Sequence, residues 1–354
     1  MQQREYFLGG NTASGFFSYY DYLMRQEDAA KIYCIKGGPG TGKSSLMKAI
    51  AAEAQKKGLD IDLIHCSSDP TSLDGLIIPK LNTAFVDGTS PHIVDPKTPG
   101  AVDTIIHLGD CWQEDDIVPL KHDIIRYNRQ ISSYFASAYR YLAAAAQLYL
   151  DTAIWSAPHV KPVVVKALKQ LKETYIAPLE NYGPQEGFLR KLFLTAITPS
   201  GIICHVPSFS GAATCVLEGP GFVTGEILHM LCTEYLALGY NVEAFYSPLN
   251  PSEQIEHLYI PALNQLFATH DIINQFSISQ NAVTIPLELS LPEDSAVIVN
   301  QNKMLMLNLL EQGVQTIQKA KTVHDLLETC YVPHMDFSKV EKIKEHILQS
   351  LVLD

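Results

Sequence analysis

An apolar strand, a glycine-rich turn and a helix follow one another in the stretch KIYCIKGGPGTGKSSLMKAI, from Lys31 to Ile50. Gly37, Gly42, Lys43 and Ser44 match the pattern G-x-x-x-x-G-K-[ST], in which backbone N–H groups surround phosphate oxygens. The lysine neutralises phosphate charge, the hydroxyl binds Mg²⁺, and the positive end of the following helix points to the same place. We therefore expect a nucleotide-phosphate site with Mg²⁺. Its binding residues would be Gly37, Gly38, Pro39, Gly40, Thr41, Gly42, Lys43, Ser44 and Ser45.

The length and charge of the chain narrow the class of protein further. Its 354 residues predict two domains, because single domains usually have about 100–200 residues. A net charge of −12 argues against a nucleic-acid partner, since such proteins neutralise phosphates with clustered lysines and arginines. The seven cysteines form no C-x-x-C pair, and neither a signal core nor a run of about 18 apolar residues is present. We expect reduced thiols, no membrane partner and a cytoplasmic location.

An apolar strand that ends in an acid, Thr83 to Asp87, follows the glycine-rich loop in the chain. In phosphate-loop proteins an acid at this position holds the Mg²⁺ shell beside the loop hydroxyl. We therefore predict that Ser44 and Asp87 share the metal, although a strand followed by an ordinary turn is the alternative. His92, a few residues later, is a weaker candidate for positioning phosphate, because loop histidines are more often solvated.

A second strand from Leu59 to His65 predicts a parallel strand–helix–strand unit, and Asp69 lies in the turn at its carboxyl end. Ligands of parallel sheets bind at that end of the strands. Asp69 is therefore a candidate for orienting an attacking water or an acceptor hydroxyl. With Lys43 and Asp87 it completes the predicted catalytic set. The next residues, Leu73 to Pro79, suggest a short helical segment.

Strong helical periodicity starts at Asp115 and continues to Ala153. A second helix from about Val160 to Leu179 is expected to return antiparallel after Ser156-Ala157-Pro158, which would give a helical hairpin appended to the α/β core. A long helix from about Glu293 to Thr329 and a shorter one from Asp336 to Leu351 have the same arrangement.

The second half of the chain repeats the first. Arg4-x-x-Phe7-Leu8 recurs 186 positions later as Arg190-x-x-Phe193-Leu194, and Gly38-Pro39-Gly40 recurs 181 positions later as Gly219-Pro220-Gly221. Further matches are Thr12-x-Ser14-Gly15 with Thr198-x-Ser200-Gly201, Glu53, Gly58 and Pro70 with Glu234, Gly239 and Pro251, and Leu81-Asn82 with Leu263-Asn264. We infer an internal duplication in which each repeat is a core followed by two helices.

The substitutions between the repeats are selective. Packing positions are kept, whereas the positions with phosphate or metal chemistry change: Gly42 to Val223, Lys43 to Thr224, Ser44 to Gly225, Asp69 to Asn250 and Asp87 to Thr269. An alternative frame pairs Gly225 with Gly42, which places Glu226 at the lysine position. In either frame the second repeat is expected to bind Mg-nucleotide poorly or not at all, and to act as a regulatory or scaffolding lobe packed against the first.

The entry segment FLGGNTASGF, the loop KGGPGTGKSS and the stretch FVDGTSPHIVDPKTPGAVD resemble an uncharacterised bacterial family of duplicated P-loop ATPases. The resemblance spans nearly the whole chain and implies a cytoplasmic ATP-binding protein with two RecA- or AAA-like lobes. The expected fold is α/β, with two tandem P-loop parallel-sheet cores that each carry a helical hairpin. We place an active core at 1–113, a hairpin at 114–185, a degenerate core at 186–292 and a C-terminal hairpin at 293–354.

Three functions are consistent with this pattern: a slow ATPase, a small-molecule or nucleotide kinase, and a nucleotide-gated interaction protein without useful turnover. ATP is favoured over GTP because the N-K-x-D and D-x-x-G motifs are missing, and slow turnover is expected because Gly88, not Glu, follows Asp87. Arg126, Arg129 and Arg140 are the only candidate lid arginines of a kinase, with a solvated helix face as the alternative. Arg190 is a candidate arginine supplied to the nucleotide by the second repeat, with a solvated strand edge as the alternative. A further protein or small-molecule partner is unidentified.

Overall fold

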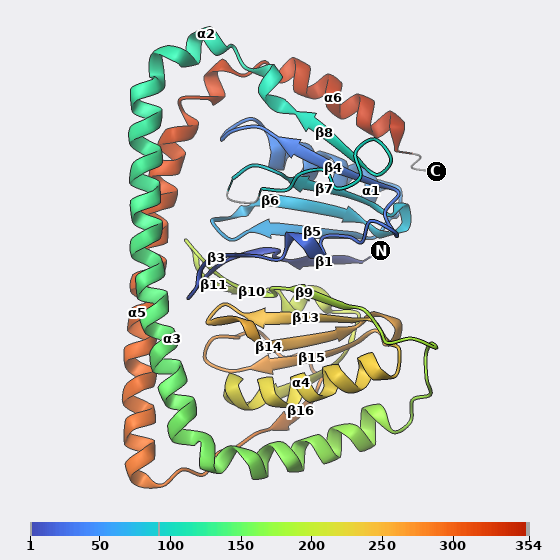
Figure 1. The fold of residues 1–354 in the computed structure, drawn as a ribbon, viewed down its shortest axis with the longest axis vertical. Coiled ribbons are helices and arrows are strands. Elements are labelled where there is room, and N and C mark those ends of the chain that lie inside the picture. The colour runs from blue at the N-terminus through green and yellow to red at the C-terminus, as the bar shows by residue number, and fades with distance from the viewer. Residues whose placement is uncertain (1, 91–92, 352–354) are drawn as a thin grey trace.

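The computed structural model describes residues 2–90 and 93–351. These residues form two α/β lobes connected by two long helices (Figure 1). The first lobe has a six-stranded sheet whose order is β1 (Gln3–Tyr6), β5 (Ile61–Cys66), β6 (Asp69–Ile78), β7 (Thr83–Asp87), β4 (Lys31–Lys36) and β8 (Asp103–His107). Strand β6 runs antiparallel to both of its neighbours, and the other pairs are parallel.

The second lobe repeats this strand order. Its six strands are β9 (Leu189–Leu192), β13 (Val242–Ser247), β14 (Asn250–Ile260), β15 (Gln265–His270), β12 (Ala213–Glu218) and β16 (Val283–Pro286). Each sheet has a two-stranded hairpin beside it, β2 (Gly9–Thr12) with β3 (Gly15–Ser18) and β10 (Thr195–Thr198) with β11 (Gly201–Cys204). Asn82 and Asn264, which the repeat pairs, have the same unusual φ of 46°. The duplication is therefore visible in the backbone, and the chain is a mixed α/β protein with two mostly parallel sheets.

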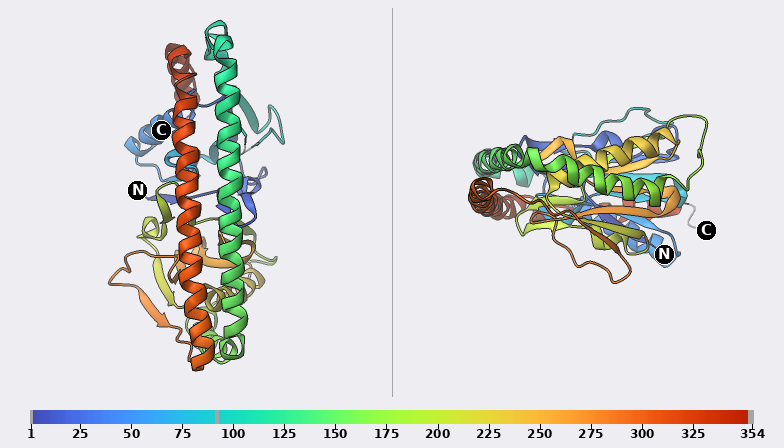
Figure 2. Two further views of the ribbon diagram at one scale, coloured as in Figure 1. Left: turned by 90° about the vertical axis from the view of Figure 1, so that its left-hand side faces the viewer. Right: turned by 90° about the horizontal axis from the view of Figure 1, so that it is seen from below.

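The helices are α1 (Lys43–Lys56), α2 (Glu114–Ile117), α3 (Lys121–Leu171), α4 (Gly221–Ala237), α5 (Glu293–Glu328) and α6 (Phe337–Ser350). Helices α3 and α5 run side by side past both lobes (Figure 2). Gly313 of α5 permits this close approach, because a Cβ there would lie 2.7 Å from a methyl group of Leu142 on α3. No helix within 2–90 and 93–351 is long and apolar enough to cross a membrane.

Each repeat sends its terminal helical segment to the lobe of the other repeat. Met335, Val340 and Ile347, in or just before α6, pack into the core that lies around α1 of the first lobe. The last turns of α3, including Val160 and Leu171, pack into the core that contains α4 of the second lobe. Figure 1 shows α6 beside the first lobe and the end of α3 below the second. The helices thus bind the two repeats into one unit.

The predicted hairpin at 114–185 is wrong. Helix α3 continues without a break through Pro158 and Pro162, and Figure 1 shows it bending and then running beneath the second lobe. A proline inside a helix removes one hydrogen bond, kinks the helix and costs about 3 kcal/mol. The helix continues past the kink when tertiary packing offsets that cost. Buried Val160 and Val164 supply that packing here. In the second repeat the expected two helices are present as α5 and α6.

The predicted helical segment from Leu73 to Pro79 is also wrong, because these residues belong mostly to strand β6. This strand is buried on both faces over its second half, so its sequence is a continuous apolar run without alternation. Strand β6 forms a tight hairpin with β5, and Asp69 is its first residue.

The two sheets meet at their edge strands, β1 and β9. Phe7 and Phe193 are equivalent residues of the two repeats, and each donates its N–H to the carbonyl of the other, at 2.9 and 3.0 Å. Beside them Glu243 accepts from Arg4 at 2.9 Å and from Arg190 at 2.7 Å. The reciprocal pairing of equivalent residues places a local two-fold relation at this junction.

Candidate functional site

The glycine-rich loop connects β4 with α1. Gly40 and Gly42 have φ values of 69° and 87°, a left-handed conformation that glycine adopts without strain. The loop therefore turns tightly before the helix begins at Lys43. The Lys43 ammonium lies over the loop and donates to the carbonyls of Gly37 and Gly38, at 2.7 and 2.9 Å. Thr41 also donates to Gly38, at 2.9 Å.

Asp87 lies next to this lysine. Strand β7 pairs in parallel with β4 and places Asp87 opposite Ile35, at the carboxyl end of both strands. One carboxylate oxygen is 3.6 Å from Lys43 Nζ. The other accepts the N–H of Thr89 at 2.8 Å, and the Thr89 hydroxyl donates to Gly37. The loop, the lysine and the acid therefore form one connected group of side chains and backbone.

Ser44 and Asp69 are held by neighbouring strand residues. The Ser44 hydroxyl accepts the N–H of Leu73 at 2.9 Å and keeps a second lone pair for a cation. Asp69 accepts from Thr71 at 2.7 Å and lies 3.3 Å from Lys321 of α5. Partial burial raises the pKa of Asp69, but the hydrogen bond from Thr71 and the Lys321 ammonium outweigh it, so its pKa lies below the usual value. A carboxylate of lowered pKa is a weak base, so the contacts favour a positioning role.

The second repeat covers the loop of the first. The segment 331–337 comprises most of the connection from α5 to α6 together with Phe337, the first residue of α6, and is called the strap below. A Cβ built on Gly40 would lie 2.6 Å from Val332 Cγ2, and one on Gly42 would lie 3.6 Å from Phe337. Two backbone hydrogen bonds of 2.9 Å, from Gln113 to His334 and from Asp336 to Cys111, fix the strap to the first lobe. The strap of the second repeat therefore lies against the glycine-rich loop of the first.

The corresponding loop of the second repeat has a different backbone shape from that of the first. Helix α4 begins at Gly221, almost one turn earlier than α1 begins in the repeat register. Val223, which replaces Gly42, is helical and would be strained in a left-handed conformation. Thr224 and Thr269 replace Lys43 and Asp87, are fully buried, and share a hydrogen bond of 2.7 Å. A pair of core hydroxyls therefore stands where the first repeat has an ion pair.

A cavity of about 930 Å³ lies beside this second loop and was not anticipated from the sequence. Its wall includes the buried Ser156 hydroxyl, which has no hydrogen-bond partner. No local pattern announces the cavity, because distant segments form it. Among the residues that line it are Tyr149, Phe222, Asp271, Phe276, Leu289, Lys303 and Met306.

Arg190 does not reach the glycine-rich loop. Its guanidinium is committed to the junction of the lobes, where it donates to Glu243, to the Tyr6 hydroxyl and to the carbonyls of Tyr22 and Leu23. Both readings of Arg190, as a supplied arginine and as a solvated strand edge, are therefore wrong. It is a structural residue whose side chain is 15% exposed.

The remaining candidates fall on α3 or outside the described residues. Arg126 pairs with Asp123 at 2.8 Å, and both side chains are more than half exposed. Arg129 and Arg140 are also exposed, as a solvated helix face predicts. His92 lies outside the described residues.

Comparisons of the chain with protein-family models, with curated proteins and with solved structures found no match. The class of the protein is therefore inferred from its own residues and geometry.

Proposed function

We propose that the first lobe binds Mg-ATP and hydrolyses it slowly, while the second lobe binds no nucleotide at its loop. The observation that carries the proposal is the position of Lys43, folded over the carbonyls of a left-handed glycine loop and 3.6 Å from Asp87. A lysine held by loop carbonyls can exchange them for phosphate oxygens, and the loop N–H groups then bind the same phosphates.

Each residue has a definite role in this proposal. Lys43 would neutralise the phosphates, whereas Ser44 and Asp87 would hold Mg²⁺ directly or through its water shell. Asp69 would position Lys321 and the β5–β6 hairpin near the nucleotide. Gly88 follows Asp87 where many ATPases carry a water-polarising glutamate, which supports a low turnover number.

The strap favours a second candidate, a nucleotide-gated interaction protein. Phosphates that enter the loop would change its shape, and Val332 and Phe337 of the strap lie beside Gly40 and Gly42 of that loop. Helices α5 and α6 would then report the nucleotide state to the rest of the molecule. This function needs binding but no useful turnover.

Phosphate release tests the proposal. The full chain with ATP and Mg²⁺ should release phosphate slowly without any acceptor, and Asp87→Ala should lose metal-dependent release while it keeps its fold by circular dichroism. Asp110→Ala is a matched control, because Asp110 is an exposed acid that contacts His107. Release that required an added nucleoside or nucleotide would identify a kinase. Binding without any release would favour the gated protein, and full release by Asp87→Ala would contradict the assigned metal role.

A further inference from the structure

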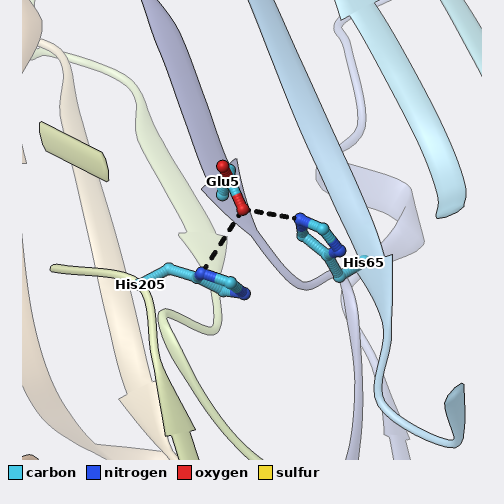
Figure 3. A group of neighbouring side chains, drawn as sticks. All are labelled: Glu5, His65 and His205. Carbon is cyan, nitrogen blue, oxygen red and sulfur yellow. Dashed lines mark hydrogen bonds and ion pairs between the residues drawn. The ribbon is translucent and has the colours of Figure 1, made fainter. Parts of the chain in front are cut away.

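A second group of polar side chains lies at the junction of the two lobes, away from the glycine-rich loop. Glu5 extends from β1 and His65 from β5 of the first lobe, whereas His205 follows β11 of the second (Figure 3). Glu5 Oε2 is 2.9 Å from His65 Nε2 and 3.6 Å from His205 Nδ1. The three side chains point toward a common centre, and their donor atoms all lie within 4.8 Å of one another.

These separations fit a bound transition-metal ion. Zn²⁺ binds histidine nitrogen and carboxylate oxygen at about 2.0–2.2 Å in a tetrahedron, which places donor atoms about 3.3 Å apart. The two measured separations lie on either side of that value. Two histidines and one carboxylate also leave a fourth position open for water or a further ligand.

The hydrogen bonds of His65 leave a need for positive charge. Its Nδ1 is 3.1 Å from the carbonyl of Pro70, which can only accept, so Nδ1 carries a proton. In the neutral ring Nε2 then presents a lone pair to the Glu5 carboxylate at 2.9 Å, which is repulsive. Either a second proton or a cation must lie between them. The bond to Pro70 is also the kind of contact that orients a metal-binding histidine.

His205 brings its Nδ1 atom to the group from the second lobe, and its side chain is 17% exposed. The other ring nitrogen, Nε2, is buried and makes no hydrogen bond, so no contact of Nε2 explains how the ring is oriented.

The duplication supplies an internal comparison. The repeat offsets pair Glu5 with Lys191, His65 with Tyr246 and His205 with Tyr19. At the equivalent place the Lys191 ammonium lies 5.3 Å from the centre of the Tyr246 ring. The centres of the Tyr19 and Tyr246 rings are 5.5 Å apart. The fold is therefore satisfied by a cation–π stack at this position. Packing alone does not explain two histidines and a glutamate.

Hydrogen bonds within the protein already hold the segments that carry these side chains in place. The Ser208 hydroxyl accepts the N–H of Glu5 at 3.0 Å and donates to the carbonyl of His205 at 2.8 Å. The two imidazole rings stack with centroids 4.8 Å apart. A preformed site loses little conformational entropy on binding.

We propose that Glu5, His65 and His205 bind one divalent transition-metal ion, with Zn²⁺ as the preferred ion, and that this ion clamps the two lobes together. The ligands come from both repeats, so binding holds the first lobe against the second. Nothing in this site depends on nucleotide.

Calorimetric titration of the full chain with Zn²⁺, without nucleotide, tests the clamp. Wild type should bind one ion tightly. The double variant His65→Ala/His205→Ala should lose at least about tenfold in affinity, because mutating residues that only hydrogen-bond to metal ligands already costs that much. His107→Ala is the matched control, because this exposed histidine also contacts a carboxylate, Asp110, at 2.8 Å. Zn²⁺ should raise the melting temperature of wild type and of His107→Ala, but not that of the double variant.

Two further variants keep the test decisive. Glu5→Gln preserves side-chain shape and should also lose affinity, which covers the case in which the double variant fails to fold. Lys43→Ala should bind Zn²⁺ normally, so failure of this proposal is separate from failure of the ATP proposal. The seven free cysteines are alternative ligands, and unchanged tight binding by the folded double variant would overturn the site. Absence of tight Zn²⁺ binding by wild type would overturn it equally.

Discussion

Two pairs of equivalent residues distinguish the loop regions of the two lobes. Lys43 and Asp87 form an ion pair at the end of the first sheet, whereas Thr224 and Thr269 share a buried hydrogen bond in the second. The equivalence of these two pairs could be predicted from sequence, because alignment of the repeats matches Lys43 with Thr224 and Asp87 with Thr269. The partner of Asp69 could not, because Lys321 is far away in the chain and the contact depends on how α5 crosses the first lobe.

A buried acid in the second lobe predicts a pH effect on stability. Glu256 on β14 is 2% exposed, and burial together with Asp271 raises its pKa to about 8. The folded protein therefore keeps this proton up to about pH 8, whereas the unfolded chain releases it near the ordinary glutamate pKa of 4.5. The contribution of Glu256 to the free energy of unfolding is therefore fully present below about pH 4.5 and is lost as the pH rises toward 8.

Glu256→Gln removes that dependence. The variant should gain melting temperature relative to wild type at pH 8, with a smaller difference at pH 5. Glu253→Gln, an exposed acid on the same strand, should change neither value. Thermal melts at both pH values measure the difference, and an equal effect of Glu256→Gln at pH 5 and pH 8 would contradict the account.

At the scale of single elements, sequence patterns identified most strands and helices but misjudged two. The prolines of α3 suggested a chain reversal. The helix instead continues past them, and its apolar face after Pro158 is buried by the second lobe. The apolar run of β6 has no alternation, because both faces are covered. In both cases tertiary packing decided what local preference left open.

The start of the loop helix predicts the effect of one substitution. Gly42→Val introduces the residue found in the second repeat and forces a left-handed position toward the helical conformation. Mg-ATP binding should be abolished, and the strain should cost about 1–3 kcal/mol of folding free energy. Calorimetry and chemical denaturation measure the two effects.

Gly100→Val is the control for that strain. Gly100 also has a positive φ, 78°, and a Cβ there would contact nothing within 4 Å. It should lose similar stability and keep nucleotide binding. Normal Mg-ATP affinity in Gly42→Val would show that the left-handed turn is not needed.

At the scale of the whole molecule, the exchange of helices makes the repeats interdependent. The end of α3 packs on the second lobe and α6 packs on the first, so the core of each lobe includes residues from the other repeat. Periodicity in the sequence shows that these helices have an apolar face, but it does not show which lobe covers that face. The exchange follows from the length and bend of α3, which only the three-dimensional structure provides.

The charged junction between the lobes predicts a large loss of stability from one substitution. Glu243 is 8% exposed and accepts from Arg4 and Arg190, one from each repeat. Glu243→Gln leaves two buried guanidinium groups with less compensating charge, which should cost about 3–5 kcal/mol. Glu53→Gln, an exposed acid paired with Lys56, should leave the melting temperature unchanged. Denaturant unfolding compares the variants, and a loss no larger than that of the control would contradict a buried ionic junction.

Calorimetric titration with Mg-ATP tests the central claim most directly. Wild type should bind one ATP per chain, and Lys43→Ala should bind none while its circular dichroism spectrum and melting temperature stay close to those of wild type. Thr224→Ala, at the equivalent position of the second repeat, should still bind one ATP. Two sites per chain, or unchanged affinity in Lys43→Ala, would contradict the account.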